Sequence, residues 1–283
     1  MEKKRKSWLL TLIFLAAMLG AGYLQIQYDT HNDYFRKRET FLTLPSGKTL
    51  RILSFGFKNL VADMLFIWSI QFYSNYNLTN SYDYLARVYD TITDITPSYK
   101  EPYIVGSWIM SLEAKNPQMA IDLLQKGARN MPKEWIFDHE CGFYAYKNLK
   151  DYKLAEKFFA RAAANPSAPA YIKRQKAHMI YLEDNLELAY KLWTEIYNTA
   201  TDQMEKTSAT NHLQQIKFEL DKKLISQRIQ RFKELFNRIP RNLNELMRAG
   251  LLAEIPRDFD GDEYIYDQQT GEISAQKVFR WKK

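Results

Sequence analysis

Alanines recur at a near-constant interval through the middle of the chain, each within a stretch of helical hydrophobic periodicity. They are Ala86, Ala120, Ala155 and Ala189, spaced 34, 35 and 34 residues apart, and three of the stretches end at Pro97, Pro132 and Pro166. A large apolar residue follows three of the alanines: Leu124, Phe159 and Trp193. A small residue lets two helices approach closely, and a large residue fills the space between neighbouring hairpins. The pattern predicts stacked helical hairpins over residues 59–218, with the Ala86 copy degenerate because Asp90 takes the large position.

This repeat resembles the tetratricopeptide family, whose repeat is about 34 residues long. The resemblance is strongest for the second helices that contain Ala120, Ala155 and Ala189. It implies an all-α, right-handed solenoid of helical hairpins, whose first helices line a concave groove for extended peptides or helices. Carried over to this sequence, the groove-facing positions of the family are His139, Phe143, Tyr146, Arg174, His178 and Tyr181. Aromatic residues and arginine suit an interaction surface, although Phe143 and Tyr146 also fit the alternative of core residues.

The chain begins with a basic tip, residues 1–6, followed by an uncharged run from Ser7 to Tyr28. About 20 apolar residues span a bilayer as a helix, and basic residues before the span hold the N-terminus in the cytoplasm. We therefore expect a single-pass anchor of the inner (cell) membrane at 7–28, with the bulk of the chain periplasmic or extracytoplasmic. A cleaved signal peptide is the alternative, but the length of the run favours the anchor.

Residues 29–58 are expected to form a polar linker, with a turn at "PSGK" and a short extended piece after it. An apolar stretch from Asn59 to Tyr76 follows, and Asp63 and Gln71 make it a poor second span. We expect it to form the buried first helix of the solenoid, with a position on the membrane surface as the alternative. Asp63 is a catalytic candidate, but a paired or capping carboxylate is the commoner case.

Charge and cysteine content exclude several classes of protein. The chain has 283 residues and a net charge of +7, and residues 2–6 and 277–283 carry that excess. A nucleic-acid-binding protein should have a basic face on its folded body, so we expect no nucleic-acid partner. The single cysteine, Cys141, excludes an intramolecular disulfide, and the four histidines lack close metal-ligand spacing. No cofactor is expected.

The tail, residues 219–283, predicts an amphipathic helix over 219–237 and then a small cap. Gly250 ends a short helix, and "EYIYDQQTGEIS" is typical of two strands joined by a polar loop that ends at Gly271. A leucine-rich helix, a glycine, "IPRD" and "GDEYIY" in this order resemble the C-terminal region of type II secretion pseudopilins. The chain departs from that family because no prepilin cleavage motif precedes the uncharged run, so we do not expect a pilin-type subunit.

An acidic turn, "DFDGDE", lies within this cap and is a calcium candidate. Its carboxylates are Asp258, Asp260, Asp262 and Glu263. An EF-hand loop needs glycine at its sixth position, whereas Gly261 is fourth from Asp258. A solvated acidic turn is therefore the favoured interpretation.

No nucleophile with an adjacent base, paired carboxylates or cofactor loop is evident in the sequence. We therefore expect a scaffold or adaptor, not an enzyme, that binds another envelope protein in a membrane, secretion or pilus-type assembly. The alternative is an enzyme or enzyme subunit, with a polar site near His139, Glu140 and His178 or at Asp63. A polar pocket around the histidines favours the enzyme, and a groove favours the scaffold.

Overall fold

The computed structural model describes residues 44–73 and 81–277, together with residues 16, 17, 19–21 and 23. Most of the predicted anchor at 7–28 lies outside the described residues, and residues 29–43 of the predicted linker lie outside them altogether. Within the described residues, no helix has both the length and the apolar character to cross a membrane. The chain is mostly helical where it is described, and it divides into two compact units between Thr96 and Pro97.

The first unit contains the helices α2 (Gly47–Leu53), α3 (Lys58–Tyr73) and α4 (Ser81–Ile95). Residues 47–53, expected within the linker, are instead helical because the Ser46 side chain caps α2 by accepting from the Thr49 N–H. α2 lies close against α4, since a Cβ at Gly47 would come within 2.3 Å of Asp94 Cβ. The sequence-based prediction of a buried helix is wrong for the outer face of α3, because only one face packs against α4 and large apolar residues of the other face are exposed.

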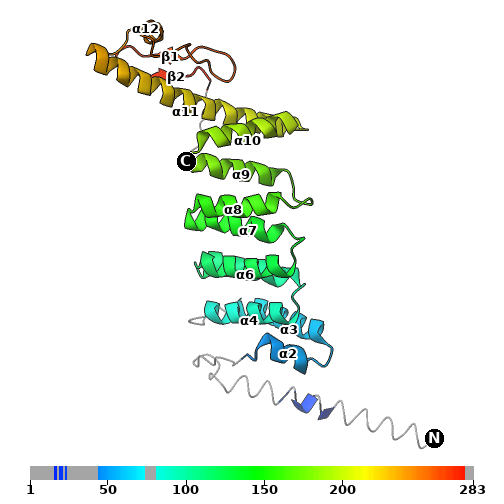
Figure 1. Cartoon of the computed structure of the whole chain (residues 1–283). Coiled ribbons are helices and arrows are strands. Elements are labelled where there is room, and N and C mark those ends of the chain that lie inside the picture. The colour runs from blue at the N-terminus through cyan, green and yellow to red at the C-terminus, as the bar shows by residue number, and fades with distance from the viewer. Residues whose placement is uncertain (1–15, 18, 22, 24–43, 74–80, 278–283) are drawn as a thin grey trace, which may run out of the picture. The chain divides into compact units, whose positions relative to one another are not determined.

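In the second unit, helices pack sequentially in pairs, each against the next along the chain (Figure 1). The elements before the long helix are α5 (Lys100–Trp108), η2 (Ile109–Glu113), α6 (Pro117–Asn130), α7 (Ile136–Tyr144), η3 (Ala145–Leu149), α8 (Tyr152–Ala163), α9 (Tyr171–Leu182) and α10 (Leu186–Thr199). The π-helical segments η2 and η3 extend α5 and α7 directly. The predicted predominance of paired helices is confirmed.

Three turns of this unit share one backbone geometry. Lys115, Lys150 and Asp184 adopt left-handed φ values of 51°, 57° and 61°. The residue after each caps the next helix with its side chain: Asn116, Asp151 and Asn185. These caps are 35 and 34 residues apart, and Ala120, Ala155 and Ala189 follow each of them by four residues. The left-handed turn residue and the helix cap therefore repeat at the same interval as the alanines.

The small and large positions pack as the sequence predicts. Ala120, Ala155 and Ala189 are fully buried, and so are Leu124, Phe159 and Trp193. Glycines add two further close contacts, from Gly127 of α6 to α7 and from Gly142 of α7 to α8. A Cβ at Gly127 would lie 2.9 Å from the Phe137 ring, and one at Gly142 would lie 2.8 Å from the Phe159 ring. Close approach of neighbouring helices therefore depends on a small residue facing an aromatic ring.

The second unit ends in a long helix, α11 (Gln203–Phe236), and a small cap that lies along it (Figure 1). The helix predicted at 219–237 is the C-terminal half of α11, which runs without a break through the proposed boundary at residue 218. The cap contains α12 (Leu243–Arg248) and the strands β1 (Ile265–Tyr266) and β2 (Ile273–Ser274). These strands pair antiparallel, which confirms the predicted hairpin. Tyr264 ties the cap to α11, because its hydroxyl donates to Asp221 Oδ2 at 2.5 Å.

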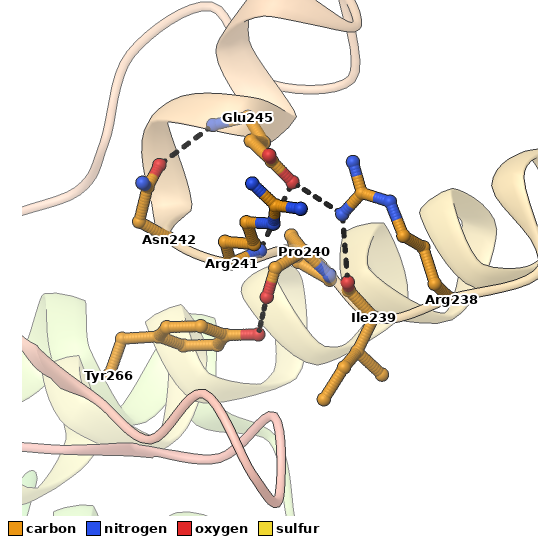
Figure 2. Close-up of polar contacts among 7 residues, drawn as sticks. All are labelled: Arg238, Ile239, Pro240, Arg241, Asn242, Glu245 and Tyr266. Atoms are coloured by element: carbon orange, nitrogen blue, oxygen red, sulfur yellow. Dashed lines mark hydrogen bonds and ion pairs between the residues drawn. The ribbon is translucent and has the colours of Figure 1, made fainter.

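A polar network holds the turn between α11 and α12 (Figure 2). Glu245 Oε2 accepts from Arg238 Nη1 at 2.7 Å and from the Arg241 N–H at 3.0 Å. Asn242 caps α12 by accepting from the Glu245 N–H. The Tyr266 hydroxyl donates to the Pro240 carbonyl oxygen at 2.7 Å, so the hairpin is fixed to the same turn.

Candidate binding site

A cavity of about 330 Å³ lies in the second unit among side chains of α7, η3, α8, α9, α10 and α11. Four of the six residues predicted to face a groove line it: Phe143, Tyr146, Arg174 and His178. They come from two first helices of the predicted repeat, α7 with its extension η3, and α9. The structure therefore brings most of the predicted positions together in one place.

A third helix, α11, also lines the cavity, and the sequence analysis did not predict its contribution. His212 and Ser208 of α11 line it, and they lie 34 residues after His178 and Arg174. Phe143, in turn, lies 35 residues before His178. Continuing the alanine interval by one step along the chain would have identified both residues of α11. Equivalent positions of α7, α9 and α11, which alternate with α8 and α10 along the chain, thus meet at one cavity.

The other two predicted residues have different surroundings. His139 lies beside the cavity, with its ring 5.8 Å from Phe159 and 5.7 Å from Tyr171, two residues that line it. Tyr181 is fully buried. Its hydroxyl donates to Glu219 Oε1 at 2.6 Å and accepts from Gln215 Nε2 at 2.6 Å. Tyr181 therefore joins α9 to α11 as a core residue and does not face a groove.

Aromatic rings form the floor of the cavity. His212 lies parallel to Trp193, with 3.8 Å between ring centroids, and His178 is 5.5 Å from His212. Burial lowers the pKa of His212 to about 3, with a smaller effect from His178. Burial also lowers the pKa of His178, assisted by the positive charge of Lys147. Both imidazoles are therefore neutral at neutral pH, and the floor carries no charge.

Charged groups are confined to the rim. Arg174 Nη1 lies 2.7 Å from Glu205 Oε1, so its charge is compensated within the protein. Lys147 Nζ lies 4.7 Å from the centroid of the Tyr146 ring, and Lys150 Nζ lies 5.9 Å from it. The edge at Tyr146 is therefore positive, while the interior is apolar and aromatic.

Two buried polar atoms of the lining residues have no hydrogen-bond partner within the described part of the chain. They are Trp193 Nε1, a donor, and Gln175 Oε1, an acceptor. A buried group left without a partner costs about 1–3 kcal/mol. A bound group that brought an acceptor to the indole N–H would therefore be favoured.

The residues of the enzyme alternative do not form one site. Asp63 is exposed on α3 of the first unit. His139 Nδ1 lies 3.1 Å from Glu140 Oε1, whereas His178 faces His212 and Tyr146. Cys141 is buried, and burial raises the pKa of its thiol. The enzyme alternative stays a prediction that no grouping of these residues supports.

Three carboxylates of the acidic turn bind groups of the cap or of α11. Asp258 Oδ1 accepts from the N–H groups of Asp260 and Asp262, at 3.0 and 2.8 Å. Asp260 accepts from Gln214, and Glu263 pairs with Arg257 at 3.1 Å. Among the described residues, no three histidine, cysteine or carboxylate side chains are grouped so that they could hold a metal ion.

Comparison with known proteins provides no assignment, because neither a protein family nor a curated protein matches this chain.

Proposed function

We propose that this chain is a membrane-anchored scaffold whose helical hairpins form a right-handed solenoid of tetratricopeptide type and hold a segment of another protein. The observation that carries the proposal is that Phe143, His178 and His212, at equivalent positions of the alternate helices α7, α9 and α11, line one cavity. In solenoids of stacked hairpins, such positions form the binding surface.

The lining of the cavity indicates the chemistry of the bound segment. Phe143 is 37% exposed and presents an apolar edge, and the neutral histidine and tryptophan rings form an uncharged floor. An aromatic or aliphatic side chain of a partner fits such a site. Lys147 and Lys150 beside Tyr146 favour an acidic residue next to that apolar anchor.

The uncharged run from Ser7 to Tyr28 behind a basic tip supports the location of the scaffold. With the N-terminus in the cytoplasm, the second unit is periplasmic or extracytoplasmic. The partner in this proposal is another envelope protein of a membrane, secretion or pilus-type assembly.

A photo-crosslinking amino acid at Phe143 tests the proposal in cells. It should capture a defined partner, identified by mass spectrometry of the crosslinked band. The matched control is the same amino acid at Leu188, which is 41% exposed against 37% for Phe143 and does not line the cavity. Equal capture of the same protein at both positions would contradict a specific site.

Variants of Tyr146 then test the energetics with the captured partner. Tyr146→Ala should weaken binding by about 1–3 kcal/mol, as loss of an interface anchor does, while Tyr146→Phe should retain most of the affinity because the ring remains. The melting temperature of each variant serves as the control for folding. If Tyr146→Ala lowers the melting temperature but leaves the dissociation constant unchanged, Tyr146 is a core residue and the proposed site is wrong.

A further inference from the structure

Large apolar side chains of neighbouring segments are exposed in the first unit, outside the proposed partner site. They come from the end of α2, the turn after it and the outer face of α3: Ile52, Leu53, Phe55, Phe57, Leu60 and Met64. Each is between 54% and 85% exposed. We call these six residues the α2–α3 apolar surface. A grouped apolar surface of this kind marks an interaction site, whereas scattered exposed apolar residues do not.

The backbone holds these side chains outward. Phe55 and Gly56 adopt left-handed φ values of 47° and 94°, and the Phe57 N–H donates to the Ser54 carbonyl oxygen at 2.8 Å. A bulky residue at positive φ is uncommon and strained, so this turn is fixed by its surroundings. The helices on both sides of the turn pack against α4, α2 through the close approach at Gly47 and α3 through the Trp68 ring, 5.7 Å from the Tyr84 ring.

The charged residues of the two helices that carry this surface are mainly basic, and Asp94 of α4 lies on the packed side of α2, against Gly47. Lys48, Arg51 and Lys58 lie on α2 and at the start of α3, and Asp63 is the single acidic residue between positions 47 and 73 of the sequence. Exposed phenylalanine and aliphatic side chains bordered by basic residues are typical of segments that lie in the interface of an anionic bilayer. A protein partner with a matching apolar face would not require this positive border.

The position of the α2–α3 apolar surface along the chain also favours contact with a bilayer. Residues 29–46, a stretch of 18 residues, separate Gly47 from the end of the uncharged run at Tyr28. Fully extended, 18 residues reach at most about 65 Å, so an anchored chain limits the distance of the surface from the bilayer. Insertion is then intramolecular, and a modest affinity for the interface suffices.

We propose that the α2–α3 apolar surface inserts into the interfacial layer of an anionic phospholipid bilayer and forms a second membrane contact of the chain. The inference rests on the membrane anchoring of the proposed function but not on its partner site. Phe55 and Phe57 enter the boundary between headgroups and acyl chains, Leu60 and Met64 follow along α3, and Lys48, Arg51 and Lys58 face the anionic headgroups.

Depth-resolved fluorescence quenching of the full chain tests this proposal. A thiol-reactive, environment-sensitive dye is placed at Phe55→Cys or Leu60→Cys, and at Arg87→Cys as the control, because Arg87 is an exposed residue of α4 in the same unit. The unsubstituted chain gives the labelling background, since Cys141 is buried. The protein is reconstituted into vesicles of phosphatidylcholine and phosphatidylglycerol with nitroxides either near the headgroup or near the chain end.

An interfacial segment enters about 5–10 Å into the bilayer, so the shallow nitroxide should quench the dyes at 55 and 60 at least about two-fold more than the dye at 87. The deep nitroxide should quench them less than the shallow one. Replacing both Phe55 and Phe57 with serine should remove most of the quenching at 60, whereas Asn59→Ser should leave it unchanged. Equal quenching at 55, 60 and 87 would overturn the proposal.

A carbonate wash of the same vesicles separates this inference from the anchor. Protein that stays with the vesicles while the dyes at 55 and 60 remain unquenched refutes the membrane contact and leaves the anchor standing. Protein that is washed off after quenching was observed retains the membrane contact and refutes the anchor. A blue shift of the dye at 55 that depends on protein concentration in lipid-free detergent would show that a second copy covers the surface, and would also overturn the proposal.

Discussion

At the scale of single residues, His212 makes the stability of the folded chain depend on pH. Its imidazole lies on the Trp193 ring at 3.8 Å, and burial lowers its pKa from the ordinary 6.5 to about 3. In the unfolded chain the same imidazole takes up a proton near pH 6.5. The unfolded state therefore binds more protons between pH 6.5 and 3, and the free energy of unfolding falls as the pH falls through this window.

The first prediction follows from this difference. Acidification from pH 7 to pH 5 should lower the free energy of unfolding by about 2 kcal/mol through His212 alone. His212→Phe keeps an aromatic ring without a titrating group, so it should lose about that much less stability over the same range. Denaturant unfolding of both proteins at each pH gives the comparison, because the other titrating groups are common to both. Identical pH profiles would mean that His212 is protonated in the folded protein.

At the scale of the helices, packing depends on a small residue opposite an aromatic ring. Gly142 of α7 faces Phe159 of α8, and a Cβ at Gly142 would lie 2.8 Å from two ring carbons. Phe159 is 1% exposed and lines the cavity, so its ring can relieve this contact only by moving into that space and disturbing the packing of the lining. Alanine has the higher helix propensity by about 0.5–1 kcal/mol, but overpacking a full core costs about 1–3 kcal/mol.

The second prediction is that the steric effect outweighs helix propensity. Gly142→Ala should lower the free energy of unfolding by about 1–2 kcal/mol. Gly142→Ala combined with Phe159→Leu should be less destabilising than the sum of the two single changes, since the smaller side chain relieves the contact. Chemical denaturation of the four proteins of this cycle measures the coupling. A stabilised Gly142→Ala variant would show that propensity dominates and that the ring moves aside.

The positions of these helices can be predicted from the sequence more reliably than which side of each helix is buried. Ala120, Ala155 and Ala189 could be predicted as buried because close helix packing admits only small side chains at a regular interval. The burial of α3 could not be predicted, because a helix that is apolar nearly all round does not indicate which face meets α4. For the same reason Tyr181 was assigned to the groove, although its hydroxyl is bound by Glu219 and Gln215 of α11.

At the scale of the whole molecule, the repeat and the cap share one helix. The N-terminal part of α11 contributes His212 to the cavity, and its C-terminal part carries Asp221, which accepts from Tyr264 of the cap. Asp221 is 7% exposed, and Lys217 of the same helix pairs with it, so the buried carboxylate has two partners. The predicted boundary at residue 218 therefore falls inside one continuous helix, whose two halves pack against different parts of the unit. The sequence could not show this, because an amphipathic pattern indicates which face of a helix is apolar but not what covers that face.

The third prediction concerns the orientation of the whole chain and is independent of the partner and of the α2–α3 apolar surface. Lys3, Lys4, Arg5 and Lys6 precede the uncharged run from Ser7 to Tyr28, which is long enough for a spanning helix of about 20 residues. Basic residues on the N-terminal side resist transfer across the bilayer, so the remainder of the chain should be translocated.

A reporter enzyme that is active only outside the cytoplasm, fused after Lys283, should therefore be active, and the fusion should stay with the membranes after a carbonate wash. Replacing Lys3, Lys4, Arg5 and Lys6 with glutamine should reduce reporter activity, because the charge asymmetry that orients the span is lost. The matched control replaces Arg36, Lys37 and Arg38, beyond the run, and should leave the activity unchanged or raise it. Release of the protein into the soluble fraction, or a mature N-terminus near Tyr23, would show that the run is a cleaved signal peptide, and the scaffold would then reach its partner without an anchor of its own.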